Sequence, residues 1–358
     1  MKKLLLSVFI IFSVFQSNAQ TKVIKMSATK STDYGVQYFL PKTILSIEVN
    51  YSKITQKAGP FAKYAERYLG LGEEAVIGED KVYYTLDKIS VESFGIPDKS
   101  ESYLVEFKAK TTSPFVYLTE DGLICAINAD YTVESVVGAG SGVRSASGSS
   151  VINSQSVYTE EYIRAGSVNK MAEVAAKQIY KIRESRNDIL TGEAENVPRD
   201  GEGIKIVLAN LEAQEKALVA LFTGTTQTEF LDSEFEVEPL ADIDKEVLFR
   251  FSKYNGLVDA EDLSGSPVYI NVKSIESVKE EIVDPKRKAK EPQSIVYKIP
   301  GKAAVEIFHG VNLLYNNTFQ VVQFGSNQIL ATSLFDDKKA PVKVYFYPNT
   351  GAIKQIVQ

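Results

Sequence analysis

Residues 167–224 contain two amphipathic runs that decide the fold, NKMAEVAAKQIYKIRESRNDIL (169–190) and GIKIVLANLEAQEKALVALFT (203–223). Their apolar residues recur mostly at helical spacing, which predicts two helices that each have one apolar face. Gly192 and Gly224 follow the runs, where glycine commonly ends a helix, and Asp200 can cap the second run. Two such faces bury most readily against each other or against a sheet. The apolar positions are Met171, Val174, Ala175, Ile179, Ile182 and Ile189, then Ile204, Val207, Leu208, Leu211, Leu218, Leu221 and Phe222.

This periodicity predicts which side chains of the hairpin are core positions. We expect Ile182, Leu208, Leu211 and Leu218 to face the other helix or an adjacent sheet. Truncation of Leu211 to alanine is then expected to cost about 2–5 kcal/mol, because it removes buried contacts and leaves a cavity.

The polar segment between the two runs is a candidate interaction loop. Its sequence, EAENVPRD (193–200), is too polar to bury, and two arginines precede it in the first run. Salt bridging and capping that fix the angle between the helices are the favoured interpretation. A partner-binding edge of the hairpin is the alternative. The candidate residues are Arg183, Arg186, Glu193, Glu195, Arg199 and Asp200.

Strand patterns with a period of two flank the hairpin on both sides. Thr43, Leu45, Ile47 and Val49 alternate with polar residues before it, and residues 342–347 form one of several strand patterns after it. We therefore predict an α+β fold: two antiparallel β-rich modules, each a sandwich or open barrel, with the long helical hairpin between them. The expected divisions are a signal peptide (1–19), a β-rich domain with one short helix (20–137), a Gly/Ser-rich flexible linker (138–156), the hairpin (157–224) and a C-terminal antiparallel β domain (225–358).

The first residues have the pattern of an export signal. Lys2 and Lys3 precede an apolar run of about a dozen residues, and Ala19 is a small residue at the expected cleavage site. No cysteine lies near that site, so a lipid anchor is not indicated, and the apolar run is too short to span a bilayer. The formal net charge is −6, which disfavours binding to nucleic acid. An envelope protein or a polysaccharide is a more suitable partner for an exported acidic protein.

Few residues could support catalysis or hold a metal. His309 is the one histidine, and no GxSxG elbow accompanies it, so a surface histidine is the favoured interpretation. Cys125 is the one cysteine and alternates with Leu123 and Ile127, which predicts a buried thiol that is dispensable for activity. One histidine and one cysteine exclude the usual zinc sites, and the pairs Asp242/Asp244 and Asp336/Asp337 lack EF-hand spacing. We therefore predict no cofactor and no metal site.

Several stretches carry a resemblance to a known family. They are YFLPKTILSIEV (38–49), GPFAKYAERYLG (59–70), KIRESRNDILTGEAENVPRDG (181–201), EAQEKALVALFTG (212–224), YKIPGKAAVEIF (297–308) and TGAIKQI (350–356). Together they resemble the domain-of-unknown-function family forty-eight thirty-one of exported proteins from Bacteroidetes-type bacteria. The resemblance implies a periplasmic, outer-membrane-associated or secreted location in a Gram-negative bacterium. It carries no reaction, substrate or catalytic residue.

Three functional hypotheses follow. The leading one is a non-catalytic envelope protein that serves binding or assembly. The second is a carboxylate-dependent hydrolase of envelope or external polymers, for which the 46 acidic residues provide many candidate pairs. The third is a periplasmic chaperone-like protein that offers the hairpin or a strand edge to its clients.

Overall fold

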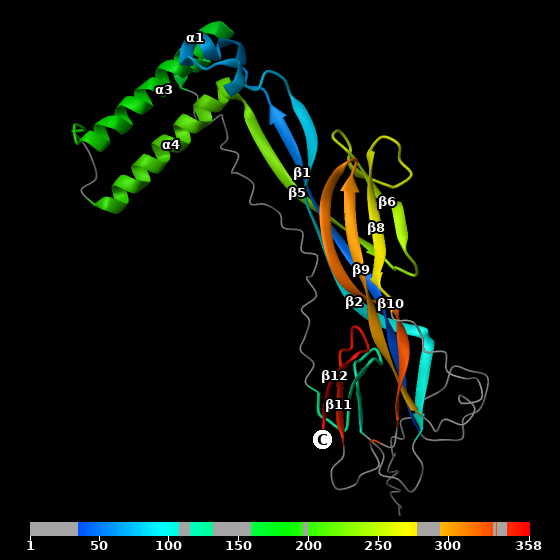
Figure 1. Ribbon diagram of the computed structural model, residues 1–358. Coiled ribbons are helices and arrows are strands. Elements are labelled where there is room, and N and C mark those ends of the chain that lie inside the picture. Colours follow the sequence, from blue (N-terminus) through cyan, green and yellow to red (C-terminus); the bar gives the residue numbers. More distant parts are fainter. Residues whose placement is uncertain are drawn as a thin grey trace, which may run out of the picture.

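A computed structural model describes residues 35–106, 115–131, 159–195, 200–277, 294–331, 334 and 342–358. The predicted signal peptide and the predicted Gly/Ser-rich linker lie outside these ranges. The molecule is elongated, with helices at one end, two long sheets in the middle and a small sheet at the other end (Figure 1).

The central part contains a three-stranded sheet in the order β2-β1-β5. Its members are β1 (Gly35–Lys57), β2 (Lys81–Glu106) and β5 (Thr225–Val237), and both pairings are antiparallel. The predicted alternation holds in β1, where Leu45, Ile47 and Val49 are buried while Glu48 is exposed. One face of this sheet therefore belongs to the core, and the other carries polar side chains.

A five-stranded sheet in the order β10-β9-β8-β6-β7 covers the apolar face of the first sheet. Phe249, Val268 and Val305 from this second sheet join Leu45 and Ile47 in one core cluster. All its pairings are antiparallel, and the two sheets form a sandwich. The members are β6 (Ile243–Ser252), β7 (Gly256–Val258), β8 (Ser266–Glu276), β9 (Ser294–His309) and β10 (Asn312–Ala331).

A four-stranded sheet in the order β12-β11-β4-β3 lies at the end remote from the helices (Figure 1). It packs on the outer parts of the long strands, where Tyr38 and Leu40 of β1 meet Ile295 of β9 and Leu330 of β10. Its members are β3 (Val116–Leu118), β4 (Ile124–Ile127), β11 (Lys343–Phe346) and β12 (Ile353–Val357).

The helical end is built on the hairpin of α3 (Val168–Thr191) and α4 (Gly201–Thr223). The short helix α2 (Glu160–Ile163) precedes α3. The connection between β1 and β2 supplies η1 (Ala62–Tyr64), α1 (Ala65–Leu69) and η2 (Glu73–Ala75). Phe61 from this connection meets Phe222 of α4 with a distance of 5.4 Å between ring centroids, so the base of the hairpin rests on a separate apolar core.

The base of the hairpin is anchored to the connection between β1 and β2. The amide of Phe61 donates to the carbonyl of Leu221 at 2.8 Å, and the amide of Ile77 donates to the carbonyl of Thr223 at 2.9 Å. Gly224 then turns the chain into β5 with a φ of 84°, and a Cβ at this position would strike the carbonyl oxygen of Lys57. Glycine therefore permits both the turn and the close approach of the two backbones.

The α+β class and the antiparallel sheets with a helical hairpin between them agree with the prediction. The sheets, however, do not separate at the hairpin as two modules would. β5 follows the hairpin but pairs with β1, and β11 from near the C-terminus pairs with β4. Two of the three sheets thus combine strands from both sides of the hairpin. Period-two alternation reveals that a strand has one buried face, but it does not identify the neighbouring strand.

Candidate functional site

The two arginines of the predicted interaction loop are engaged within the hairpin. Arg183 of α3 donates through Nε to Glu215 Oε1 of α4 at 2.6 Å, and Arg186 donates through Nη1 to Glu215 Oε2 at 2.9 Å. The Glu215 side chain is only 13% exposed, whereas those of Arg183 and Arg186 are 43% and 38% exposed. The carboxylate of Glu215 on α4 therefore pairs with two arginines on successive turns of α3, which agrees with the salt-bridging interpretation.

Replacement of Arg186 by alanine should change the free energy of unfolding by less than about 1 kcal/mol, because this ion pair is partly solvated and Arg183 still pairs with Glu215. Urea melts of the variant and the parent measure the difference. The matched change of Lys177, whose exposed side chain pairs with Glu173 within α3, should be equally mild. A loss above about 3 kcal/mol in the Arg186 variant would show a buried pair instead.

The remaining members of the predicted loop do not form a cluster. Asp200 caps α4, because its Oδ2 accepts from the amide of Gly203 at 2.9 Å. The side chains of Glu193 and Glu195 are exposed. Arg199 lies outside the described residues. The capping role of Asp200 is thus confirmed, and Glu193 and Glu195 present exposed carboxylates in the described part of the loop.

The burial of the apolar stripe of the hairpin decreases from the base of the hairpin to its distal half. Ile182 and Leu218 are buried as predicted, and Leu221 and Phe222 are buried beside them. Leu211 packs against this buried cluster but is only half-buried. The prediction that Leu208 is a core position was wrong, since it is half-buried like Ile204 and Val207. The stripe itself is present, but two helices alone cannot enclose it where no third element of the described ranges lies against them. In the described ranges, η1, α1 and α2 cover only the base of the hairpin, and the other half extends away from the sheets (Figure 1).

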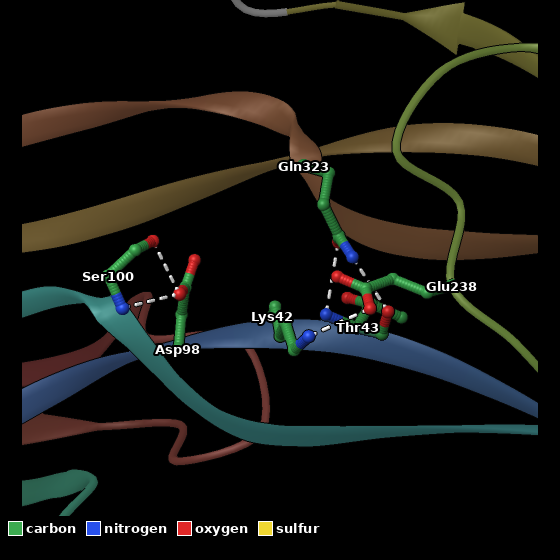
Figure 2. Close-up of polar contacts among 6 residues, drawn as sticks. All are labelled: Lys42, Thr43, Asp98, Ser100, Glu238 and Gln323. Atoms are coloured by element: carbon green, nitrogen blue, oxygen red, sulfur yellow. Dashed lines mark hydrogen bonds and ion pairs between the residues drawn. The ribbon is translucent and has the colours of Figure 1, made fainter.

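A second polar arrangement joins the two sheets of the sandwich, and no pattern in the sequence predicts it. Figure 2 shows the side-chain amide of Gln323 (β10) against the backbone of Thr43 (β1). The Thr43 amide donates to Gln323 Oε1 at 3.0 Å, and Gln323 Nε2 donates to the Thr43 carbonyl at 2.7 Å. The Thr43 hydroxyl accepts from the amide of Val322 at 3.0 Å. β10 bulges here, so the side chain of Gln323 takes the place of a neighbouring strand for Thr43.

The charged groups near the contact between Thr43 and Gln323 are suited to a structural role rather than to proton transfer. Lys42 pairs with Glu238 at 2.7 Å, and Asp98 Oδ1 accepts from the amide and hydroxyl of Ser100 at 2.9 and 2.6 Å (Figure 2). Burial alone would raise the pKa of the Asp98 carboxyl, but the bonds from Ser100 and the charges of Lys42 and Lys298 together lower it. Asp98 is therefore ionised at neutral pH and is a poor general acid for a hydrolase.

The one histidine lies beside a serine. Ser266 Oγ and His309 Nε2 are 2.6 Å apart, and Ser266 Oγ also donates to the carbonyl of Phe251 at 3.1 Å. A hydroxyl has one proton, and the carbonyl can only accept it, so Ser266 accepts the bond from a protonated Nε2. A histidine that donates to serine is not a base for it, and the pair therefore does not form a nucleophilic site in this arrangement.

Cys125 is fully buried in β4, and its Sγ lies 3.7 Å from the carbonyl of Leu123. Burial raises the pKa of its thiol to about 11. Because the thiolate is the reactive form, we expect negligible labelling by a thiol reagent near neutral pH in the native protein and rapid labelling after unfolding in urea. Labelling of the native protein as fast as that of the unfolded chain would contradict the burial.

No group of three or more His, Cys, Asp or Glu side chains suited to a metal occurs within the described ranges. The carboxylate of Asp242 accepts from the amide of Ser274 at 2.9 Å, and Asp336 and Asp337 lie outside those ranges. Two open hollows of about 460 and 450 Å³ lie at the helical end. Glu160 and Lys170 line the first, and Glu79 and Lys81 line the second. Of the helices that the structure describes, none has the length and apolar content needed to cross a membrane.

Comparison with known proteins identifies a family but no reaction. The family model described as "Domain of unknown function (DUF4831)" matches residues 34–354. No curated protein and no solved structure matches the chain.

Proposed function

The chain belongs to the DUF4831 family. We propose that it binds a partner through its helical hairpin, as its geometry supports, and that it is an exported envelope protein, as the pattern of its first residues supports. The binding surface in this proposal is the distal half of the hairpin, residues 183–191 of α3 and 201–211 of α4. Its function would be binding or assembly rather than catalysis.

The incomplete burial of the apolar stripe carries this proposal. Val207, Leu208 and Leu211 are half-buried, although they continue the stripe that is fully buried at Leu218 and Phe222. Ile206 and Leu190 are 61% and 68% exposed in the same half. Apolar surface of this kind on a projecting element is typical of a site that another protein covers.

The shape and charge of the surface indicate the kind of partner. A stripe between two nearly parallel helices can accept an amphipathic helix, which completes the burial that the pair leaves unfinished. Glu193 and Glu195 are exposed at the end of the hairpin, so basic residues beside the apolar face of the partner would be complementary.

Photo-crosslinking in intact cells tests the proposal. A photoreactive residue at Leu208, which is half-buried on the apolar stripe, should form one discrete adduct with a partner protein. The same residue at Leu240, which is 73% exposed between β5 and β6, is the control and should not form that adduct. Equal patterns at both positions would overturn the proposal. A continuous range of adduct sizes from position 208 would favour the chaperone-like alternative, because clients differ in size.

Export is the second element of the proposal and rests on the pattern of residues 1–19. We expect the mature protein to begin at Gln20 and to lack an acyl group. Mass spectrometry of the protein purified from the envelope measures both properties. An intact Met1 on the purified protein would contradict export through a cleaved signal.

A further inference from the structure

Three loops at one end of the five-stranded sheet expose large apolar side chains. Tyr254 in the β6–β7 turn is 76% exposed, Leu263 in the β7–β8 loop is 81% exposed, and Val311 in the β9–β10 turn is 97% exposed. These three residues are called the loop patch below. Figure 1 shows the loops around β6 and β8 and the end of β9 at the same end of the sheet.

Hydrogen bonds hold these loops next to one another. Asn255 Nδ2 donates to Ser264 Oγ at 3.2 Å, which joins the first loop to the second. The bond between Ser266 and His309 at 2.6 Å joins the start of β8 to the turn that carries Val311. The amide of Tyr84 donates to the carbonyl of Lys253 at 2.8 Å, so the first turn is also fixed to β2.

The second loop is also ordered by internal bonds. The amide of Asp262 donates to the carbonyl of Asp259 at 3.0 Å, and Asp262 Oδ1 accepts from the amide of Ser264 at 2.9 Å. The Arg250 guanidinium donates to the carbonyls of Ala260 and Gly265 at 2.7 and 3.2 Å. A surface that is held in place before binding loses little conformational entropy when a partner arrives.

The charge around the loop patch indicates which kind of partner could bind there. Asp259, Glu261 and Asp262 are exposed beside Leu263. Arg250, which donates to loop carbonyls, and Lys253, which lies 5.6 Å from the centre of the Tyr83 ring, keep their positive charges, so the three carboxylates leave the rim with a small negative excess. An acidic rim repels anionic lipid headgroups and also repels a second copy of itself, whereas it attracts a cationic segment.

We propose that the loop patch binds a cationic, apolar segment of another protein, with Leu263 and Val311 contacting its apolar side chains and Asp259, Glu261 and Asp262 facing its basic residues. This site is separate from the distal half of the hairpin. The protein would then hold two partners, or two parts of one partner, at different places along its length.

Binding of a defined probe tests this proposal on the full chain. The probe is a short fluorescent peptide that alternates lysine with leucine and tyrosine, and its control replaces each lysine with glutamate. Fluorescence anisotropy should show saturable binding of the lysine peptide alone, and salt should weaken it because the carboxylates contribute. Leu263→Ser combined with Val311→Ser should weaken binding at least about tenfold, as expected when exposed contact residues at the centre of an interface are removed.

Control variants test whether the peptide binds at the loop patch. Leu240→Ser changes an exposed leucine at the opposite end of β6 and should leave binding unchanged. Glu261→Lys should weaken binding, whereas Glu120→Lys in the turn before β4 should not. All the changed side chains are exposed, so unchanged melting temperatures are expected. Equal binding of both peptides, equal loss with Leu240→Ser, binding to anionic vesicles in place of the peptide, or dimerisation through the patch would each overturn the proposal.

Discussion

Replacement of Phe222 by alanine is expected to lower the free energy of unfolding by about 3–5 kcal/mol, the range for truncation of a large buried aromatic residue. Phe222 is fully buried near the C-terminal end of α4, and its ring meets that of Phe61. Phe61 is in turn 6.1 Å from the ring of Tyr162, measured between centroids. The variant would therefore leave a cavity where α4, α2 and the β1–β2 connection converge.

Leu211→Ala is the matched control for this change, because it lies on the same stripe of α4 but is half-buried. Its cost should fall below about 2 kcal/mol, since part of the side chain is already solvated. Urea melts of the parent and the two variants provide the comparison. Equal costs for the two variants would mean that the base of the hairpin is no better packed than its distal half.

Replacement of Tyr38 by alanine is expected to have an effect of similar size, about 3–5 kcal/mol. Tyr38 is 1% exposed, and its ring stacks on that of Tyr103 with 5.8 Å between centroids. Its hydroxyl accepts from the amide of Val296 at 2.8 Å and donates to the carbonyl of the same residue at 3.0 Å. One side chain thus connects β1 to β9 beside the four-stranded sheet.

Tyr38→Phe removes the hydroxyl and keeps the ring, so it measures the contribution of the hydroxyl alone. It should cost about 1–3 kcal/mol, because both the amide and the carbonyl of Val296 lose a hydrogen-bond partner. Burial raises the pKa of the Tyr38 hydroxyl, and the bond to Val296 opposes this only in part. Its contribution to stability is therefore present below the pKa of an unfolded tyrosine, about 10, and is lost as the pH rises beyond that value. Tyr38→Phe should lack this loss in melts at alkaline pH, and an identical alkaline response in both proteins would contradict the assignment.

Local signals in the sequence were sufficient to predict the two helices of the hairpin and where they end. Asp200, Gly192 and Gly224 lie at the helix ends, where their capping chemistry predicts them. The burial of Leu218 followed from periodicity, whereas the half-burial of Leu208 did not. Periodicity defines which face of a helix is apolar, but the elements that cover that face are brought there by tertiary structure.

The features that join distant parts of the chain could not be predicted in this way. The pairing of β5 with β1 across the hairpin depends on segments far apart in sequence, as does the contact of Gln323 with Thr43. The loop patch has a partial signal in the sequence, since Asn255-Gly256 is a residue pair typical of a hairpin turn. That Leu263 and Val311 lie near this turn follows only from the order of the strands.

The base of the hairpin is packed, and we propose that its distal half binds a partner. Hydrogen–deuterium exchange along α4 of the purified protein compares the two halves. Amides of residues 217–223 should exchange only with global unfolding, while those of residues 204–211 should exchange much faster through local opening. Equal protection of both segments would contradict the proposal, because the distal half would then already belong to the stable core.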